Sequence, residues 1–370
     1  MKITHVETLH VAPRWLFVKV HTDEGLLGLG ECLGDKARAV AGAVDELAGY
    51  LTGQDPFRIE HHWQAMYRGG FWRGGPILNA AISGVEIALW DLLGKALGVP
   101  IYQLLGGKCR DRVRMYPQIR GGSLEELAES AAAAVGQGFT AVKWSPLRAT
   151  RAVDTPKMRH QAVEQLRVVR EVVGAEVDIL IDMHGRLSPA MAILLGERFA
   201  EYDPMFLEEP CLPENVDAMA RIARTLRTPI ATGERLLTKF GFREVLEKQA
   251  AAILQPDVTT CGGIMELKKI AAMAEAYYVA VAPHNPYGPL ATAASLQVDA
   301  CIPNFLIQEF VALGEGYLKK PIAVTDGYAD IPDGPGLGVE LDDEAIRDKP
   351  RQSWDISVWF HADDGSVADW

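Results

Sequence analysis

Apolar and polar residues follow two different rhythms along this chain. Over residues 15–31 (WLFVKVHTDEGLLGLGE), two runs rich in β-forming residues flank a polar turn at 23–25, which is typical of a hairpin. Apolar residues then recur at helical spacing over 37–51 and 77–97. This first rhythm predicts an α+β domain over residues 1–112.

The second rhythm is an alternation of short apolar runs with helical patterns. We expect helices at 124–136, 161–173 and 265–276. The expected strands are eight, at 112–119, 140–144, 177–182, 205–209, 229–234, 251–257, 278–284 and 304–309. Strands that alternate with helices favour parallel βαβ units, and eight such strands predict a closed α/β barrel over residues 113–319.

The end of the chain has neither rhythm. Residues 320–370 are rich in Pro, Gly and Asp. We expect this C-terminal segment to return and pack on the first domain.

The composition argues against nucleic acid and membranes as partners. Asp and Glu number 49 against 37 Lys and Arg, so the net charge is −12 and no nucleic acid is expected. The first ten residues lack a signal-peptide core, and no apolar run reaches the roughly 18 residues of a membrane helix. We therefore expect a cytoplasmic protein with no membrane partner. Its scattered cysteines are expected to be reduced thiols: Cys32, Cys109, Cys211, Cys261 and Cys301.

Acidic residues end three consecutive strands of the expected barrel. Asp182, Glu208 and Glu234 are separated by 208 − 182 = 26 and 234 − 208 = 26 residues. One βα unit has about this length, so each acid occupies the same place on its strand. The carboxyl ends of barrel strands converge on one mouth, where active sites form.

Three carboxylates at one mouth repel one another. Two unit charges ~4 Å apart cost about 4 kcal/mol at an effective dielectric of 20, and a divalent cation removes that cost. Oxygen ligands favour Mg²⁺, with Mn²⁺ as a substitute. The opposing interpretation is that each acid separately pairs with an Arg or Lys. Alternation along the strand turns either Glu208 or Glu209 away, and the 26-residue period selects Glu208.

The next strands continue the series with Asp257, His284 and Glu309. An Asp beside a His can orient the ring and raise its basicity. His184 lies two residues after Asp182, so an extended chain would turn both toward the mouth. A metal would then have an imidazole on each side, one to take a proton and one to give it.

This arrangement suits removal of a proton next to a carboxylate. A positioned base supplies about 10²–10⁴ in rate, and a metal on the carboxylate oxygens stabilises the enediolate that forms. An acid on the other side can then protonate a β-hydroxyl, which leaves as water. A hydroxy acid would become a 2-keto-3-deoxy acid.

Several long motifs resemble the enolase superfamily, mandelate racemase subgroup, over essentially the whole chain. They are VKVHTDEGLLGLGE, ALWDLLGKALGVPIYQLLGG, IDMHGR, LEEP, TGERL, LQPDVTTCGGI and APHNPYGPL. Within the subgroup the chain most resembles the D-galactonate dehydratases, through PRWLFVKV, GQDPFRIEHHWQAMYRGGFWRGGPI, MHGR and DDGSVADW. The resemblance implies a (β/α)7β barrel with an α+β capping domain, and barrel proteins of this kind usually form homo-oligomers.

The resemblance also implies roles. Mg²⁺ would bind the carboxylates of Asp182, Glu208 and Glu234. His284 would take the C2 proton of a D-galactonate-like aldonate, and His184 would be the acid at its C3 hydroxyl. Asp257 would raise the basicity of His284, and Glu309 would help to hold the enediolate.

Three positions depart from the galactonate dehydratases, and all are expected near the substrate. The second strand of those enzymes has Lys-x-Asn where this chain has Lys143-Trp144-Ser145. Their base histidine precedes Cys and their last acid precedes Gln, whereas this chain has Asn285 and Phe310. The departures leave the identity of the sugar acid open, including another aldonate or an aldarate.

Two different functions are also compatible with these residues. The same site could racemise or epimerise a 2-hydroxy acid, although the racemase pattern Lys-x-Lys is absent at 143–145. The fold could also serve a non-catalytic sugar-acid binder. Loops 11–15 and 69–75 are expected to select the substrate, and Arg14 and Arg73 could contact it or be structural.

Overall fold

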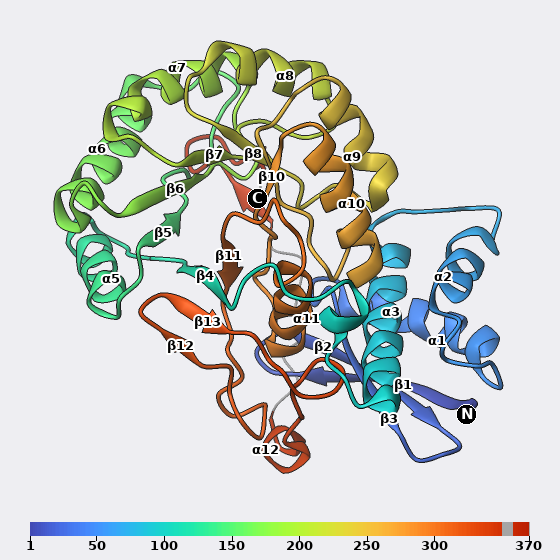
Figure 1. The fold of residues 1–370 in the computed structure, drawn as a ribbon. Helices are drawn as coiled ribbons and strands as arrows, with labels where there is room; N and C mark the ends of the chain where they lie inside the picture. The colour runs from blue at the N-terminus through green and yellow to red at the C-terminus, as the bar shows by residue number, and fades with distance from the viewer. Residues whose placement is uncertain (350–357, 370) are drawn as a thin grey trace.

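The computed structural model describes residues 1–349 and 358–369. A ring of strands and helices forms the larger part, and a smaller domain with the N-terminus lies beside it (Figure 1). The predicted C-terminal segment, 320–370, includes residues 350–357 and 370, which lie outside the described residues.

The smaller, capping domain is a three-stranded antiparallel sheet with helices packed on it. Its elements are β1 (Ile3–Val11), β2 (Trp15–Thr22), β3 (Leu27–Cys32), α1 (Ala37–Leu51), α2 (Ile59–Arg68), α3 (Pro76–Leu97) and α4 (Ile101–Leu104). The predicted hairpin joins β2 to β3. Helix α3 lies very close to β3, since a Cβ on Gly30 would be 2.1 Å from the backbone oxygen of Gly84. Glycine is therefore required at this contact.

Helix α3 is long and apolar enough to cross a membrane by length and composition alone. However, 83% of its most apolar stretch is buried inside the protein. The helix instead packs between the sheet of the capping domain and the barrel helix α10 (Ile264–Ala276).

The larger part, between residues 112 and 310, is a (β/α)7β barrel. Its strands are β4 (Arg112–Pro117), β5 (Ala141–Trp144), β6 (Asp178–Asp182), β7 (Phe206–Glu208), β8 (Ile230–Thr232), β9 (Ile253–Leu254), β10 (Ala280–Val281) and β11 (Gln308–Phe310). Between them lie α5 (Leu124–Gly136), α6 (Pro156–Val173), α7 (Pro189–Phe199), α8 (Val216–Thr225), α9 (Thr238–Glu247), α10 and α11 (Pro289–Asp299). A short 3-10 helix, η1 (Ala200–Tyr202), follows α7.

The strands pair in parallel around the ring. The order β10-β9-β8-β7-β6-β5 is continuous, and β11 pairs with β4. Two isolated parallel bridges, Gln118↔Lys143 and Val281↔Phe305, close the remaining gaps. Each predicted strand is present, although several are shorter than predicted. Helix α6 begins at Pro156, earlier than the predicted 161, because Thr155 caps a first turn that has little apolar pattern.

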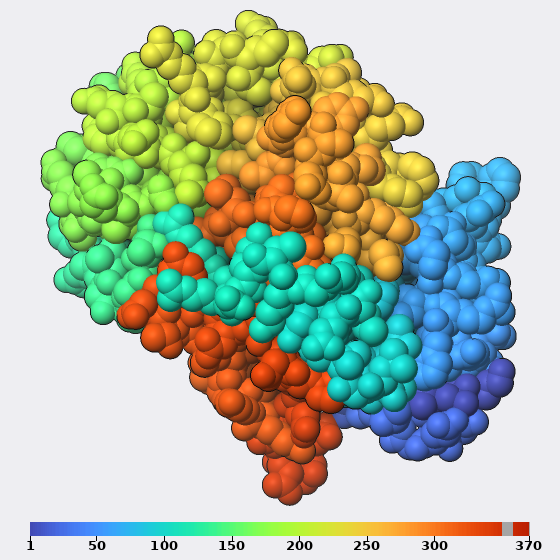
Figure 2. All heavy atoms as spheres, viewed as in Figure 1, coloured from blue at the N-terminus to red at the C-terminus, as the bar shows by residue number. Residues whose placement is uncertain are grey.

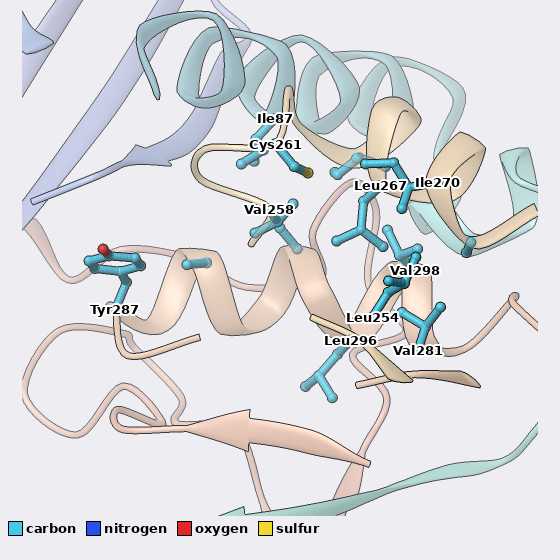
Figure 3. Packing of buried hydrophobic residues seen from close by; sticks show 14 of the residues in the cluster. Ile87, Leu254, Val258, Cys261, Leu267, Ile270, Val281, Tyr287, Leu296 and Val298 are labelled. Atoms are coloured by element: carbon cyan, nitrogen blue, oxygen red, sulfur yellow. The ribbon is translucent and has the colours of Figure 1, made fainter. Parts of the chain in front are cut away.

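Eight buried side chains fill the barrel interior, one from each strand or from the residue next to it. These side chains are Tyr116, Ala141, Leu180, Phe206, Ala231, Ile253, Ala282 and Ile307. Together they form a floor beneath the carboxyl ends of the strands. A second apolar core joins the barrel to the capping domain, and Figure 3 shows Ile87 of α3 close to Val258 and Cys261 of the loop after β9.

The segment after the barrel contacts both parts of the molecule. Its β13 (Tyr328–Asp330) pairs antiparallel with β4, and β12 (Val324–Thr325) pairs antiparallel with β13. Figure 2 shows this segment on the surface beside the start of the barrel. Asp343, at the start of α12 (Asp343–Arg347), forms an ion pair with Lys19 of β2.

The last described residues form a hairpin on the barrel side. It consists of β14 (Trp359–Phe360) and β15 (Val367–Ala368). Arg151, after β5, forms ion pairs with Asp363 and Asp364 at its turn. Within the described part of the C-terminal segment, Asp343 and Leu337 contact the capping domain, and this hairpin contacts the barrel.

Candidate active site

Three carboxylates meet at the carboxyl ends of β6, β7 and β8. Asp182 and Glu208 are the last residues of their strands and are paired in register. Glu234 follows β8 by two residues. One carboxylate oxygen of each lies within 4.8 Å of those of the other two. The equal sequence spacing of these acids therefore corresponds to a shared position in space.

The carboxylate cluster fits a hard divalent cation. Mg²⁺ binds oxygen ligands at about 2.0–2.1 Å, so neighbouring ligand oxygens stand about 3 Å apart. The three carboxylate oxygens, which lie within 4.8 Å of one another, would have to move closer together to bind one ion. Burial and the charge of Asp182 raise the pKa of Glu208 well above its usual range, although Lys143 opposes them. A cation would relieve this concentration of negative charge.

Lys143 is a site residue that the strand-end argument did not select. Its Nζ lies 2.8 Å from Glu208 Oε1, 2.8 Å from Glu309 Oε1 and 3.7 Å from Asp182 Oδ2. Burial would lower the pKa of Lys143, but Glu208 and Glu309 raise it well above the usual value. The side chain is therefore a fixed positive charge and not a base. Two sequence signals pointed to it: a lysine near the end of a strand otherwise made of apolar residues, and its match to the Lys-x-Asn pattern of the galactonate dehydratases.

Glu309 lies on β11 and is fully buried beside that lysine. Gln118 Nε2 donates to its Oε1 at 2.8 Å, and the backbone N–H of Asn285 donates to its Oε2 at 3.0 Å. Burial would raise the pKa of Glu309, yet Lys143 and His284 lower it to about 2. Glu309 is thus a carboxylate whose charge is compensated.

His284 and Asp257 form a hydrogen-bonded pair. Nδ1 of His284 lies 2.8 Å from Asp257 Oδ2, and Nε2 lies 3.5 Å from Glu234 Oε2. Burial would lower the pKa of His284, but Glu234 and then Asp257 raise it to about 10. The pair directs Nε2 toward the carboxylate cluster.

His184 reaches the cluster by a different route from the one predicted. The extended-chain argument is wrong here, because the strand ends at Asp182 and His184 has a positive φ of 51°. Its backbone N–H donates to Asp182 Oδ1 at 2.9 Å, and its Nε2 lies 3.4 Å from Asp182 Oδ2. A turn therefore brings the ring to the mouth. Burial lowers the pKa of His184, with Asp182 and Glu234 opposing the change.

Glu209 is turned away from the cluster, as the 26-residue period indicated. Its φ is 42°, and its carboxylate accepts hydrogen bonds from Thr232 Oγ1 and from the backbone N–H of Gly233. Arg235 Nε lies 3.4 Å from Glu209 Oε2. Glu209 therefore supports the loop after β8.

A cavity of about 780 Å³ opens over the cluster, a volume suited to a small molecule. Its walls come from both parts of the chain. The capping domain contributes Arg14, Leu33, Asp35 and Pro76, and the barrel contributes residues that include Gln118, Lys143, Asp182, His184, Arg186, Glu234, Arg235, Asp257, His284 and Tyr287.

Only some of the departures from the galactonate dehydratases lie on this cavity. Trp144 and Ser145 line it. Asn285, in contrast, directs its Nδ2 to Thr292 Oγ1 at 2.9 Å, and Phe310 stacks on Phe139 with ring centroids 5.6 Å apart. Asn285 and Phe310 thus adjoin the site residues His284 and Glu309 in the chain, while their side chains pack within the barrel wall.

Arg14 and Arg73, whose roles the sequence left undecided, occupy different places. Arg14 lines the cavity and donates from Nη2 to the backbone oxygen of Pro286. Arg73 lies instead on a separate hollow beside Trp63, Lys239 and Phe240. Arg14 is therefore the one placed to contact a ligand over the carboxylate cluster.

Comparison with known proteins matches both parts of the chain. The family model described as "Mandelate racemase / muconate lactonizing enzyme, N-terminal domain" matches residues 3–106, and "Enolase C-terminal domain-like" matches residues 126–345. Among curated proteins, the chain is 44% identical to a D-galactonate dehydratase of Ralstonia pickettii (strain 12J) and 42% identical to one of Pectobacterium atrosepticum. Each alignment covers 100% of both chains.

Solved structures are also similar to this chain over nearly its whole length. A putative dehydratase from Mesorhizobium loti is 39% identical and superposes with a TM-score of 0.89, covering 94% of this chain and 98% of that one. A putative mandelate racemase/muconate lactonizing enzyme from Burkholderia SAR-1 is 37% identical, with a TM-score of 0.91 and 95% of each chain covered.

Proposed function

The chain belongs to the enolase superfamily, in the mandelate racemase and muconate lactonizing enzyme family, and we propose that it is a Mg²⁺-dependent dehydratase of a D-galactonate-like aldonate. The reaction class is that of a hydro-lyase acting on a sugar acid, in keeping with the full-length relatives named D-galactonate dehydratase. The observation that carries the proposal is the hydrogen-bonded pair of His284 and Asp257 facing three converging carboxylates.

His284 would remove the C2 proton. Because Asp257 accepts the hydrogen bond of Nδ1–H, the lone pair of the neutral ring is on Nε2. A base must lie within reach of the proton that it takes, and Nε2 is the ring atom directed at the carboxylate cluster. Asp257 also stabilises the imidazolium that forms.

The negative charge that develops on the substrate carboxylate needs compensation. Asp182, Glu208 and Glu234 would hold the Mg²⁺ ion, and the bound ion would supply Lewis-acid stabilisation of the carboxylate oxygens. Lys143 adds a fixed positive charge, buried among the same carboxylates. Electrostatic groups of this kind, already in place before reaction, are often the largest single contribution to catalysis.

His184 would protonate the hydroxyl that leaves from C3. The C2 proton would move to His284, and its bonding electrons would form a C2=C3 double bond. The C3–O bond would break as the leaving hydroxyl takes a proton from His184 and departs as water. The resulting enol ketonises to a 2-keto-3-deoxy acid. The lowered pKa of His184 makes its imidazolium a stronger acid toward the hydroxyl.

The choice of sugar acid depends on the cavity wall. Trp144 and Ser145 line the cavity, and Arg14 lies on its capping-domain side. D-Galactonate is the leading substrate because the chain is 44% identical to enzymes named for it. The departure at Ser145 makes another aldonate or an aldarate the second choice.

The first experiment is a turnover screen of the purified protein, with Mg²⁺ and after EDTA treatment. The panel consists of C5 and C6 aldonic and aldaric acids, and keto acid formation is measured with semicarbazide. Keto acid from D-galactonate, lost with EDTA, is the expected result. Keto acid from a different acid alone would keep the chemistry and change the substrate. No turnover of any acid would refute the proposal.

Racemisation of a 2-hydroxy acid is the second candidate. The observation in its favour is that the two imidazoles contact different carboxylates, His184 at Asp182 and His284 at Glu234. Opposed bases could exchange a proton at C2 if no group left. Deuterium at C2 of recovered, inverted substrate would support racemisation, and keto acid would exclude it as the main reaction.

A further inference from the structure

Two buried glutamates of the capping domain accept hydrogen bonds from backbone N–H groups at the starts of two barrel helices. Glu31 of β3 has no exposed surface. Its Oε1 accepts the backbone N–H of Gly288 at 2.7 Å, and its Oε2 accepts that of Ala291 at 2.9 Å. Gly288 is the N-cap residue of α11, and Ala291 belongs to its first turn. Glu31 therefore caps a helix of the other domain.

Glu86 of α3 makes the equivalent contact with α10. Its Oε2 accepts the N–H of Ile264 at 2.7 Å, and its Oε1 accepts that of Met265 at 2.9 Å. Trp90 Nε1 donates a further bond at 2.8 Å. Glu86 is 1% exposed, so this contact is also excluded from water.

These two helices differ from others in the barrel. Helices α5, α6, α7 and α8 are each capped by their own side chain, from Ser123, Thr155, Ser188 and Asn215. Helices α10 and α11 instead begin after Gly263 and Gly288, which provide no side-chain cap. Orphan N–H groups at a buried helix start need an acceptor. For α10 and α11 that acceptor comes from the capping domain.

The glycines leave space only for these carboxylates. A Cβ on Gly288 would lie 2.5 Å from Glu31 Oε1, and a Cβ on Gly263 would lie 2.1 Å from Glu86 Oε2. The carboxyl oxygens lie at the positive ends of the two helix dipoles, which favour the ionised form, whereas burial raises the pKa of both Glu31 and Glu86 to about 8. The contacts are therefore close-fitting hydrogen bonds between the two domains.

The two capped helices follow the two loops that carry the base and its partner. Asp257 lies on the loop that leads into α10, and His284 lies on the loop that leads into α11. Figure 3 shows Val258 and Cys261 of the first loop near Ile87 of α3, and Tyr287 of the second loop at the start of α11. Each loop thus runs from a catalytic group directly to a helix start held by the capping domain.

Further contacts with the capping domain fix the same loops. Trp63 Nε1 donates to the oxygen of Gly262 at 2.9 Å, and the N–H of Gly262 donates to Ser83 Oγ at 3.0 Å. On the other loop, Tyr287 Oη donates to Asp35 Oδ2 at 3.2 Å. Neither loop is thus positioned by the barrel alone.

We propose that Glu31 and Glu86 are positioning residues that set the geometry of the Asp257–His284 pair from the capping domain, by capping α11 and α10. The inference rests on the proposed role of His284 as the base. A displacement of about 1 Å between reacting groups can cost about 10²-fold in rate. A weakened cap would therefore reduce proton abstraction without removing any group that contacts the substrate.

The test uses Glu31→Gln and Glu86→Gln in the full-length protein. An amide of the same shape presents an N–H donor where two backbone N–H groups need acceptors. We expect kcat to fall by about 10- to 100-fold with KM changed by no more than about threefold, as for an interaction that acts in the transition state. Amide hydrogen exchange should rise over residues 284–293 in Glu31→Gln and over 257–267 in Glu86→Gln.

Asp91→Asn is the matched control. Asp91 of α3 is also fully buried and accepts two backbone N–H groups, from Leu29 at 2.9 Å and Leu337 at 2.8 Å. Neither of these hydrogen bonds involves the loop that carries Asp257 or the loop that carries His284. Its variant should lower the melting temperature while leaving kcat and exchange at both loops close to wild type.

Several results would overturn the proposal. One is a wild-type kcat in both glutamate variants, and another is a loss of kcat equal to that of Asp91→Asn. Hydrogen exchange needs no substrate, so it separates this inference from the function: an inactive wild type refutes the proposed function, while unchanged exchange at both loops refutes the capping.

Gly288→Ala keeps the test available if Glu31→Gln does not fold. The backbone of Gly288, with φ −83° and ψ −176°, accepts any residue, and the three atoms nearest to the added methyl all belong to the Glu31 carboxyl group. A fall in kcat with unchanged KM supports the proposal. A wild-type kcat contradicts it.

Discussion

Nδ1 of His284 and Oδ2 of Asp257 lie 2.8 Å apart, although the two residues come from different βα units. The contact fixes the ring tautomer and leaves Nε2 facing the carboxylates. Asp257→Asn should therefore keep the fold but favour the wrong tautomer, and kcat should fall by about 10²–10⁴-fold, as for other base–carboxylate pairs. Steady-state kinetics with the substrate found in the screen measures this. A kcat within a factor of about two of wild type would show that Asp257 does not orient the base.

Substituting the two histidines one at a time should separate removal of the C2 proton from loss of the C3 hydroxyl. His284→Asn should abolish both keto acid formation and exchange of the C2 proton in deuterium oxide. His184→Asn should lower dehydration by about 10²–10⁴-fold and still allow C2 exchange, because His284 and its partner Asp257 are unchanged. Proton NMR of the substrate in deuterium oxide follows both. Retained exchange in His284→Asn, lost in His184→Asn, would reverse the two roles.

Mg²⁺ binding should release protons. In the metal-free protein burial lowers the pKa of His284, whereas Glu234 and Asp257 raise it to about 10, so the ring is protonated at pH 7. A cation on Glu234 removes the largest raising contribution and repels the imidazolium. Since the metal-bound form holds fewer protons, Mg²⁺ affinity should increase as pH rises from about 6.5 toward 10.

Isothermal titration calorimetry with Mg²⁺ at pH 8, in HEPES and in Tris, measures that proton release. The two buffers differ in ionisation enthalpy, so the observed heats should differ. Glu234→Gln is the control, because it removes both a ligand and the main cause of the raised pKa. Equal heats for wild type in the two buffers would contradict the linkage.

Lys143→Met should destabilise the metal-free protein. Nζ of Lys143 lies 2.8 Å from both Glu208 and Glu309, which have no exposed surface. Removing one member of a buried ion pair costs about 3–5 kcal/mol, because the remaining charge stays buried without compensation. Mg²⁺ should restore part of the loss. Thermal unfolding with EDTA and with Mg²⁺ measures this.

Lys319→Met provides the control for that experiment. Lys319 forms an ion pair with Glu340 at 2.7 Å, with both side chains exposed. Exposed pairs contribute little, so its melting temperature should match wild type with and without the ion. An equally small effect of Lys143→Met would show that the buried charges are compensated by another group.

Ser145→Asn should change substrate preference more than chemistry. Ser145 lines the cavity, and its Oγ lies 3.3 Å from Arg186 Nη1. A longer amide would add donors and acceptors to the wall, and ratios of kcat/KM between two sugar acids should shift by about 10- to 100-fold. Asn285→Cys is the control, since that side chain is directed to Thr292 and should leave the preference unchanged. Unchanged ratios in both variants would place specificity elsewhere.

The architecture and the acidic site could be predicted from the chain itself. Each βα unit has a similar length, so the constant spacing of Asp182, Glu208 and Glu234 was sufficient to place them at one barrel mouth. Periodicity also predicted helices α1 and α5 with their observed bounds. It missed the first residues of α6, where the helix starts with an exposed, mostly polar turn.

Side-chain direction beyond the strand ends was decided only by the tertiary structure. His184 reaches the mouth through a backbone turn with positive φ, which strand alternation does not describe. Lys143 becomes a site residue because carboxylates from two other strands surround it. Glu31 and Glu86 meet their helices across a domain boundary. Sequence patterns report the local period of each element and thereby determined the order of the strands and the convergence of Asp182, Glu208 and Glu234. The other polar contacts between distant segments depend on how the strands and the two domains pack, and only the tertiary structure decided them.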